Sequence, residues 1–386
     1  MKLLAIVPSP CCFGLQNLTL AFFGHMPGWV RPHFLTTRWT DGEFDRRLDA
    51  LGIPHTSTWM GMFSRKLDWV NLRMTMHCLL KLPVAWLRFL RLYFSFRPDI
   101  VYLANYHEIL LFWPLLFWIR RRIVCHMHDP PPAIPFQRSN FFIWRRAVGR
   151  FVFISNNVRE RIAELGPLGS NNAVIHNGIV VQRLTFPRIR TERFSEMFAW
   201  PGNSLIFGIT GQLAVNKGQM DFIEAAAIAC RSHLGMRFVI GGRGPLEYLE
   251  QLKKLVAARG LEDHVGLSGW LPHVADFYEG IDVFVLASRH EEGFGLVLAE
   301  AGERGLPAIT TSSGGAVEVL QDGITGIIVD RQDPQALAQA MVRLGADVAL
   351  RQRMGQRARE HIVEEFDVNT QAKRLAEFLC ESTLPA

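Results

Sequence analysis

The sequence has few cysteines and no long apolar segment, and both shortages exclude whole classes of protein. Its six cysteines include no C-x-x-C pair, which excludes a disulfide framework and a zinc ribbon. We expect reduced thiols and a cytoplasmic location. The longest apolar run, Ile109–Ile119, has eleven residues, whereas about 20 are needed to span a bilayer. This run is expected to form a core helix or to lie at an interface.

Disorder and low complexity are also absent. Hydrophobic residues make up 49% and charged residues 20% of the 386 positions, which is typical of a globular chain. At about 150 residues per domain, this length predicts two or three domains. A chain of this size buries a large core without disulfides or structural metals.

Charge and tryptophan are unevenly distributed along the chain. Residues 1–180 carry 21 Lys and Arg against 10 Asp and Glu, a net charge of +11, together with eight of the ten tryptophans. The remaining residues have a net charge of −5. This asymmetry indicates two modules with different partners.

Short apolar runs alternate with helical patterns, which is typical of parallel sheets built from βαβ units. In the first half the expected strands are Leu3–Val7, Ile100–Leu103, Ile123–Met127, Phe151–Ser155 and Ala173–His176. In the second half they are Leu205–Thr210, Arg237–Gly241, Val265–Leu267, Val283–Ala287, Ala308–Thr311 and Ile327–Val329. The polar stretch Arg183–Asn203 separates the two sets. We therefore predict two doubly wound domains of five to six strands, joined near residue 180, with ligands at the carboxyl ends of the strands.

The segment Ser288–Pro307 carries the most chemical information. Glu292 and Glu300 are eight positions apart, roughly two helical turns, so both carboxylates can lie along one side of a helix that begins near Gly295. Gly293 and Gly295 let the backbone turn sharply and approach a ligand closely. Free N–H groups at a helix N-terminus favour a phosphate. This turn is expected to hold a diphosphate beside ligand hydroxyls; the alternative is a plain strand–turn–helix with solvated glutamates.

The run E-G-F-G-L-V-L-A-E in this segment resembles the E-x7-E motif of retaining glycosyltransferases of family 4, which have the GT-B fold. Further pieces resemble that family in the same order: Val174–Ile179 (V-I-H-N-G-I), Gly211–Gly218 (G-Q-L-A-V-N-K-G), Val239–Pro245 (V-I-G-G-R-G-P), Gly269–Val285 and, after the motif, Gly314–Gly326. The resemblance covers nearly all of residues 174–330 and is weaker before them. Single pieces are weak signals, but an ordered set is strong.

The resemblance implies a role for each matching residue. Glu292 matches the glutamate that contacts donor-sugar hydroxyls, and Glu300 matches the one that holds the nucleotide ribose. Lys217 matches the lysine that neutralises the donor diphosphate, where charge develops as the sugar bond breaks. The other donor-binding positions are Gly293, Phe294, Gly295, Leu296, Val297, Gly211 and Gln212, with Gly241, Gly242, Trp270 and Leu271 near the base.

One position departs from the family pattern. Gln212 stands where an arginine is usual, and a glutamine does not balance diphosphate charge. Either Lys217 is sufficient, or another cation such as Arg243 or Arg289 contributes. The departure leaves the affinity for the donor open.

In the first domain, the resemblance matches His128 with the family's active-site histidine near the donor sugar. The run H-M-H-D follows a strand, so His126 and His128 share one strand face. The alternatives are a metal site, for which no further ligands are evident nearby, and a structural histidine that caps Pro130–Pro132. We expect no metal and no cofactor besides the nucleotide-sugar co-substrate. The family's glycine-rich turn after the first strand keeps only Gly14 within Ser9–Leu15.

Two segments of the first domain, Trp69–Phe96 and Ile109–Arg122, combine Leu, Trp and Phe with Arg and Lys. Basic amphipathic helices with tryptophan bind anionic membranes. The alternative is an ordinary helix packed on the sheet, which helical spacing does not distinguish. We favour membrane contact, at the inner face of the plasma membrane, because the basic excess and the tryptophans coincide in one domain. No recognised nucleic-acid module is visible, so nucleic-acid binding is not expected.

We therefore predict an α/β protein of the GT-B fold, with two Rossmann-like doubly wound domains facing across a cleft. Residues 1–180 are expected to bind the acceptor and residues 181–365 the nucleotide sugar, while residues 366–386, with a helix over Val368–Cys380, return to the first domain. The expected function is retaining transfer of a sugar to a saccharide or lipid-linked acceptor in cell-envelope polysaccharide or lipopolysaccharide biosynthesis. The alternatives are a sugar-nucleotide epimerase, a phosphorylase, or a catalytically weak carbohydrate-binding or membrane-scaffolding protein.

Overall fold

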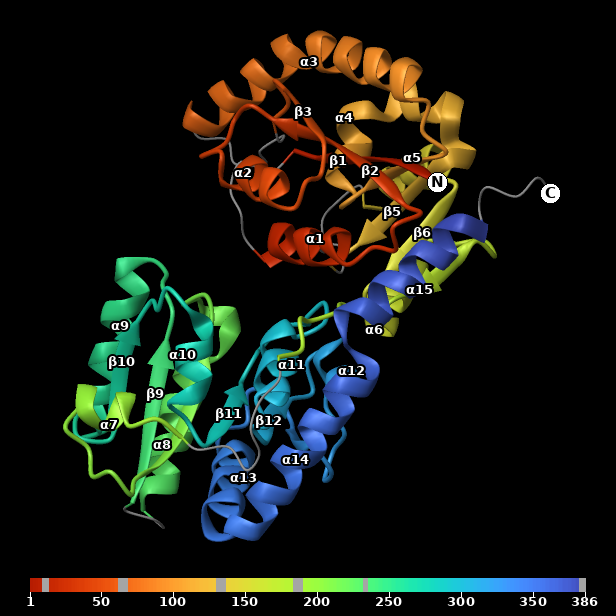
Figure 1. Cartoon of the computed structure of the whole chain (residues 1–386). Helices are drawn as coiled ribbons and strands as arrows, with labels where there is room; N and C mark the ends of the chain where they lie inside the picture. Colours follow the sequence, from red (N-terminus) through yellow and green to blue (C-terminus); the bar gives the residue numbers. More distant parts are fainter. Residues whose placement is uncertain (9–13, 62–68, 130–136, 183–189, 232–234, 382–386) are drawn as a thin grey trace. The chain divides into compact units, whose positions relative to one another are not determined.

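The computed structural model describes residues 1–8, 14–61, 69–129, 137–182, 190–231 and 235–381. The chain forms two compact units, one of Met1–Val180 with Val368–Ala386 and one of Val181–Asp367 (Figure 1). Each unit is a parallel sheet with helices between successive strands. The expectation of two Rossmann-like domains is confirmed. None of the described helices is long and apolar enough to cross a membrane.

The first unit contains a seven-stranded sheet with the order β3-β2-β1-β4-β5-β6-β7. Its strands are β1 (Lys2–Val7), β2 (Arg31–Thr37), β3 (His55–Thr58), β4 (Ile100–Leu103), β5 (Ile123–Met127), β6 (Arg150–Phe153) and β7 (Asn172–Val174). Its helices are α1 (Gly14–Gly24), α2 (Glu43–Ala50), α3 (Trp69–Phe96), α4 (His107–Leu116), the 3-10 helix η1 (Phe117–Arg122), α5 (Gln137–Ala147), α6 (Asn156–Ala163) and α15 (Val368–Glu381).

The prediction of five to six strands is wrong for this sheet, because β2 and β3 were not expected. Neither strand is an apolar run: β2 begins with Arg31 and Pro32, and β3 reads H-T-S-T. β3 is the edge strand and is only partly buried, so its sequence carries little hydrophobic signal.

Helix α15 lies against the first unit although it ends the chain. The Val368 N–H donates to the Ile179 carbonyl oxygen at 2.9 Å, and the helix packs on α1. A Cβ atom at Gly178 would lie 2.6 Å from the Val368 Cα atom. The N-G pair of Val174–Ile179 therefore allows the last helix to approach the backbone closely.

The second unit contains a six-stranded sheet with the order β10-β9-β8-β11-β12-β13. Its strands are β8 (Leu205–Thr210), β9 (Met236–Gly241), β10 (Val265–Gly269), β11 (Val283–Leu286), β12 (Ala308–Thr311) and β13 (Gly326–Val329). Its helices are α7 (Arg193–Met197), the 3-10 helix η2 (Val215–Lys217), α8 (Gln219–Cys230), α9 (Leu246–Ala258), α10 (Val274–Glu279), α11 (Leu296–Glu303), α12 (Ala316–Val319), α13 (Pro334–Ala346) and α14 (Val348–Glu365).

The strands of the second unit are nearly all apolar because helices cover them. Phe207 and Phe238 stack from neighbouring strands, and Phe222 of α8 meets Phe238 edge-on, all fully buried. Such burial contributes about 1.5–3 kcal/mol per large side chain to folding. These contacts hold β8 and β9 under α8, and β8 is paired in parallel with the other central strand, β11.

Glu108, in the first turn of α4, is a carboxyl group inside the first unit. Only 3% of the residue is exposed, and its Oε2 atom has no hydrogen-bond partner among the described residues. Burial raises the pKa of Glu108 to about 8, because the charged form would lose its hydration. The side chain is therefore mostly neutral at pH 7.

The raised pKa of Glu108 predicts a pH-dependent cost to folding. The unfolded carboxyl group ionises near its ordinary value of 4.5, whereas the folded one ionises at about 8. Between these values the unfolded state loses its proton first, so the free energy of unfolding falls by about 1.4 kcal/mol per pH unit as pH rises. Glu108→Gln, which stays neutral, should be more stable than wild type at pH 8 and close to it below pH 4.5.

Urea unfolding of both proteins at pH 5 and pH 8 measures this effect. The exposed Glu160→Gln in the same unit is the matched control and should follow wild type at both values. The raised pKa would be contradicted if the difference in free energy of unfolding between Glu108→Gln and wild type did not grow from pH 5 to pH 8.

Candidate functional site

The strands β8 and β11 are adjacent and parallel, and they are the point at which the strand order reverses. The loops at the carboxyl ends of such a pair diverge and leave a crevice for ligands. The loop after β8 is Gly211–Gly218, and the loop after β11 is Ala287–Gly295. Both loops carry segments singled out in the sequence, so the fold brings them to one place.

Lys217 and Glu292 form an ion pair between these two loops. The Lys217 Nζ atom donates to the Glu292 Oε1 atom at 2.7 Å, and the Ser288 hydroxyl donates to the same oxygen. The side chains are 31% and 16% exposed, so solvent reaches both and screens the pair incompletely. The Gly315 N–H donates to the Glu292 carbonyl oxygen at 2.8 Å, which fixes the backbone of Glu292.

Gly218 explains why Lys217 reaches this position. Its φ is +72°, and a Cβ atom there would lie 1.8 Å from the Ala287 carbonyl oxygen, at the end of β11. No side chain fits that gap, so the residue after Lys217 must be glycine. The close approach places the lysine directly beside the loop that carries Glu292.

Arg289, in the loop after β11, binds both Asp221 in the first turn of α8 and the backbone of the loop after β8. The Arg289 guanidinium donates to both carboxylate oxygens of Asp221, at 2.7 and 2.6 Å, and the Arg289 N–H donates to the Asn216 carbonyl oxygen at 2.9 Å. These hydrogen bonds to the Asp221 carboxylate raise the pKa of Arg289. The charge of Arg289 is thus already balanced within the protein.

This pairing bears on the substitution at Gln212. Of the two cations that could replace the missing arginine, Arg289 is committed to Asp221. Arg243 is exposed and lies over the Trp270 ring at 5.6 Å from its centroid. The Gln212 residue is exposed, and its carbonyl oxygen accepts from the buried Gln219 side chain at 2.9 Å.

Helix α11 begins where the sequence predicted, with Gly295 as its N-cap at a φ of +91°. This cap offers no side chain, so the first N–H groups of Leu296 and Val297 have no side-chain cap. Phe294 is 2% exposed and packs on Phe366, which fixes the turn from the inside. An uncapped N-terminus beside a lysine is suited to an anion.

Glu300 lies within α11, eight residues after Glu292, which precedes the helix. Its Oε2 atom accepts from the Tyr278 hydroxyl at 2.7 Å. Burial raises the pKa of Glu300, and burial also raises the pKa of Tyr278 well above its ordinary value. The tyrosine therefore stays protonated and orients the carboxylate, while Oε1 has no hydrogen-bond partner among the described residues.

The glycine loops after β8, β9 and β10 lie against one another. A Cβ atom at Gly242 would lie 1.8 Å from the Gly211 carbonyl oxygen, and the Gly242 N–H donates to the Gly269 carbonyl oxygen at 2.8 Å. Gly241 is packed against Phe277 in the same way. Next to them Trp270 is 57% exposed, and Leu271 is partly buried. The expected base-binding positions therefore lie on one edge of the sheet.

In the first unit, His126 and His128 lie at the carboxyl end of β5 with ring centroids 4.2 Å apart. The Tyr102 hydroxyl is 2.6 Å from the His126 Nδ1 atom. Burial lowers the pKa of His128 to about 3 and the pKa of His126 well below its ordinary value, so both rings are neutral. Both Nε2 atoms are buried without a hydrogen-bond partner among the described residues.

No group of three metal-binding side chains occurs among the residues that the structure describes. The residues Ser9–Phe13 of the first turn and Pro130–Pro132 after His128 lie outside the described residues. The proposed capping of the prolines and most of the glycine-rich turn therefore stay predictions.

Three residues of the site were not expected from the sequence: Ser288, Asp221 and Tyr278. Their partners are Glu292, Arg289 and Glu300, respectively. Ser288 is four residues before Glu292, and Asp221 is four residues after Lys217. This proximity is the only feature of the sequence that pointed to them as site residues. The pairs with Asp221 and Tyr278 form across separate elements, which spacing along the chain does not reveal.

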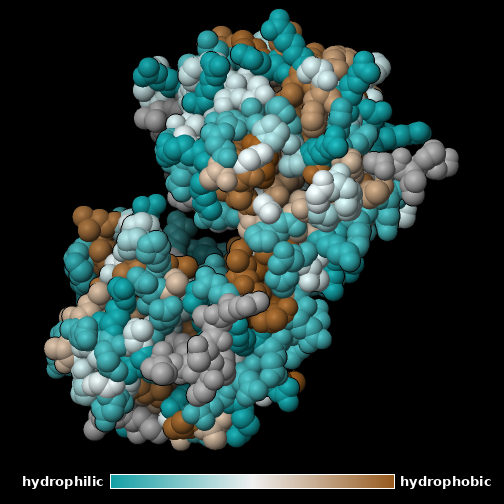
Figure 2. Space-filling model, viewed as in Figure 1, coloured by the Kyte–Doolittle hydropathy of each residue, from teal (hydrophilic) through white to brown (hydrophobic). Residues whose placement is uncertain are grey.

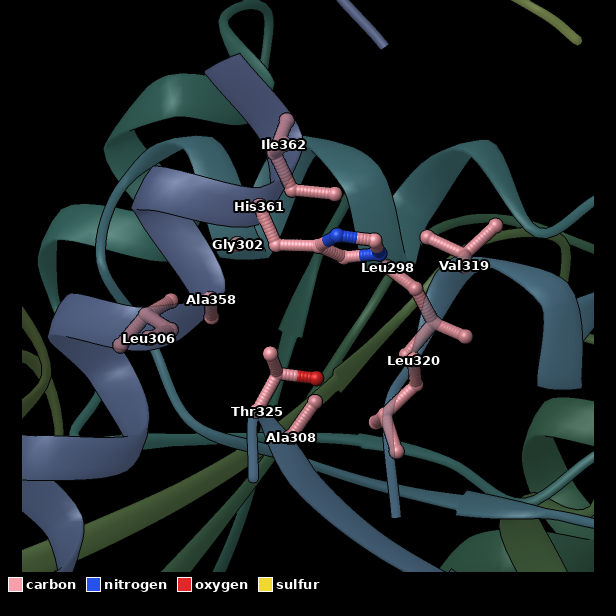
Figure 3. Close-up of a pocket in the computed structure, with 10 residues that line it drawn as sticks. All are labelled: Leu298, Gly302, Leu306, Ala308, Val319, Leu320, Thr325, Ala358, His361 and Ile362. Atoms are coloured by element: carbon pink, nitrogen blue, oxygen red, sulfur yellow. The ribbon is translucent and has the colours of Figure 1, made fainter. Parts of the chain in front are cut away.

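One pocket of the second unit is too small for a substrate. It lies between α11, α12 and α14 and is lined by Leu298, Val319 and His361 among others (Figure 3). Its volume is ≈ 10 Å³, about the space of one water molecule. The buried His361 Nε2 atom has no hydrogen-bond partner among the described residues, and a single water would satisfy it.

Two family models match the chain, one on each unit. The model of Glycosyltransferase Family 4 matches residues 29–183, and the model of Glycosyl transferases group 1 matches residues 190–361. The second match includes Lys217, Glu292 and Glu300.

Curated relatives carry glycosyltransferase names. The alpha-D-kanosaminyltransferase of Streptomyces kanamyceticus is 33% identical over 168 residues, 43% of each chain. A GDP-mannose-dependent alpha-(1-6)-phosphatidylinositol monomannoside mannosyltransferase of Mycolicibacterium smegmatis is 27% identical over 391 residues, 95% of this chain and 94% of the relative. For several of the relatives at 30% identity or more, the match spans less than half of their length.

A solved structure shows the same architecture. Anabaena HepE in complex with UDP superposes with a TM-score of 0.80 at 19% identity, covering 99% of this chain and 100% of HepE. Both units of the chain are thus similar to glycosyltransferases, and their architecture is that of the GT-B fold.

Proposed function

We propose that this protein is a retaining glycosyltransferase that moves a sugar from a nucleotide-sugar donor to a saccharide or lipid-linked acceptor. The observation that carries the proposal is the ion pair of Lys217 and Glu292 at the carboxyl ends of β8 and β11. It sets a cation and a carboxylate side by side, next to the uncapped N-terminus of α11. A nucleotide sugar presents matching groups, an anionic diphosphate joined to a hydroxylated ring.

The leaving group of such a reaction is a nucleoside diphosphate. Its negative charge grows as the bond to the sugar breaks, so fixed positive groups lower the barrier. An ammonium group has three N–H donors. Lys217 can therefore keep its bond to Glu292 and still donate to a phosphate oxygen, while the N–H groups of Leu296 and Val297 offer further donors.

The carboxylates would bind hydroxyl groups on either side of the diphosphate. Glu292 has Oε1 occupied by Lys217 and Ser288, which leaves Oε2 for a sugar hydroxyl. Glu300, held by Tyr278, would accept from the ribose. We name no protein nucleophile, and retention follows from the family resemblance. His128 is assigned near the sugar on the same basis.

The proposal also covers the class of acceptor and the cellular location of the reaction. The mannosyltransferase of Mycolicibacterium smegmatis acts on a phosphatidylinositol mannoside, which is a lipid-linked saccharide. We propose an acceptor of this kind in cell-envelope polysaccharide or lipopolysaccharide biosynthesis, used at the cytoplasmic face of the membrane. The nucleotide sugar is a co-substrate, and no resident cofactor is part of the proposal.

Donor binding is tested first by thermal unfolding with UDP, GDP, ADP and their common sugars. A ligand that binds only the folded state stabilises it by about 2.7 kcal/mol at a hundred times its Kd. One nucleotide family should raise the unfolding temperature of wild type, and Lys217→Ala should remove most of that rise. The exposed Lys254→Ala is the matched control and should keep it. An identical rise in Lys217→Ala and wild type would exclude this lysine from the donor site.

Transfer is tested with two neighbouring glutamates. Glu292→Gln removes the charge that orients Lys217 and the sugar, so kcat/KM should fall by about 10²–10³. Glu291→Gln is the control, because Glu291 pairs instead with Arg331 at 2.8 Å. It should change kcat/KM by less than about threefold. Comparable losses in both variants would mean that Glu292 has no special role.

The Asp221–Arg289 pair is tested against a second bidentate pair of the same helix. Asp221→Asn should destabilise the protein by about 1–3 kcal/mol and raise the KM for the donor, because Arg289 and the Asn216 carbonyl lose their fixed position beside Lys217. Glu224 binds Arg259 with the same geometry, at 2.7 Å for both hydrogen bonds, but on the surface. Glu224→Gln should leave both the stability and KM nearly unchanged, because solvent screens this exposed pair. An unchanged donor KM in Asp221→Asn would reject the positioning role.

A further inference from the structure

Helix α3 has a solvent-facing apolar stripe along most of its length. Trp69 is 78% exposed, Leu80 is 74% exposed and Phe94 is 69% exposed. The other members of this stripe, which we call the outer face of α3, are Leu72, Met76, Leu79, Val84 and Leu87. Apart from the adjacent Leu79 and Leu80, successive members are three, four or seven residues apart, which places the set on one side of the helix.

The opposite side of α3 already anchors the helix to the unit. Cys78, Ala85 and Phe89 are buried, and the Trp86 indole N–H donates to the Leu111 carbonyl oxygen of α4 at 2.9 Å. The helix therefore does not need its outer face for packing on the sheet. Helical spacing did not distinguish a packed face from an exposed one, and α3 has both, one apolar face inside the unit and another in solvent.

The outer face is flanked by positive charge on both sides. On one flank α3 carries Arg88, with Arg73, Lys81 and Arg91 nearby, and the helix contains no acidic residue. On the other flank, the Arg122 guanidinium donates to the Tyr93 hydroxyl at 3.2 Å and so brings η1 alongside. Figure 2 shows brown side chains among teal ones at the top of the first unit, where Figure 1 places α3.

Next to α3, the helix η1 forms a hollow that also combines apolar side chains with positive charge. It is lined by Tyr93, Phe117, Trp118, Ile119 and Arg120–Arg122. The Trp118 side chain is 84% exposed, and none of the six residues of η1 is acidic. A hollow lined by both arginines and aromatic rings is suited to a phosphate group attached to an apolar chain.

We propose that the outer face of α3, with η1, is the surface by which this protein lies on a membrane containing anionic lipids. Leu80, Leu87 and Phe94 insert among the acyl chains, and the flanking Arg and Lys contact lipid phosphates. A second copy of the chain is a poor occupant, because two such faces would bring like charges together without acidic partners. The proposal does not depend on the donor chemistry, and its test contains no nucleotide.

The test is flotation of the full-length chain with vesicles of phosphatidylcholine, with and without phosphatidylglycerol. Wild type should float with the anionic vesicles at low salt and much less at high salt, because salt screens the charge. The triple variant Leu80→Ser, Leu87→Ser, Phe94→Ser should lower the partition coefficient by about tenfold or more. The double variant Arg88→Glu, Arg91→Glu should lower it by about tenfold or more at low salt.

Matched variants of the second unit separate the surface from general effects. Leu246→Ser with Val348→Ser removes exposed apolar side chains, and Lys254→Glu with Arg353→Glu makes the same change of net charge as the α3 double variant. All of these should float like wild type. Far-ultraviolet circular dichroism and thermal unfolding establish that each variant is folded, which is expected because every changed residue is exposed.

Four results would overturn the proposal. The first is no flotation of wild type at low salt, and the second is equal flotation of wild type and the α3 variants. The third is a wild-type oligomer in the absence of lipid that the triple variant converts to a monomer, which would identify the outer face as a contact between copies. The fourth is flotation that does not depend on phosphatidylglycerol, which would reject anionic lipid as the partner and the role of the arginines.

Discussion

The second unit of this protein depends on one close approach, that of the Gly218 backbone to the Ala287 carbonyl oxygen. A side chain at position 218 would collide with the end of β11, so the loop after β8 can lie against the loop after β11 only with glycine there. That contact sets the Lys217 ammonium 2.7 Å from Glu292, and the backbone bond from Arg289 to Asn216 fixes the same register. The geometry follows from two parallel strands placed side by side at a topological switch point.

Six charged side chains of the site are paired with a side chain of opposite charge. Asp221 balances Arg289, Glu291 pairs with Arg331, and Glu292 pairs with Lys217. Glu292 lies in the loop that leads directly to the uncapped start of α11. Under the proposed function, a diphosphate would meet a lysine that is already oriented, and the structure would not have to reorganise around the new charge. The neutral Gln212 leaves Arg243 as the exposed cation of the neighbouring glycine loop.

The first unit buries ionisable side chains and exposes large apolar ones. Glu108, His126 and His128 are buried near the carboxyl ends of β4 and β5, and their pKa values are shifted toward the neutral forms. Each has a buried polar atom without a partner among the described residues, which costs stability. At the same time α3 exposes leucines and aromatic rings that a globular protein would usually cover.

The sequence by itself determined the class of fold and the position of the motif. Apolar strands such as Ile100–Leu103 and Ala308–Thr311, and the helix that begins after Gly295, were predictable because hydrophobic periodicity and glycine are local signals. The polar edge strand His55–Thr58 was not, because its burial comes from neighbours distant in the chain. Only the tertiary structure decided that Arg289 is bound by Asp221, that Tyr278 holds Glu300, and that the outer face of α3 meets solvent. Each of these depends on which segments the fold brings together, and that choice is made by packing and not by spacing along the chain.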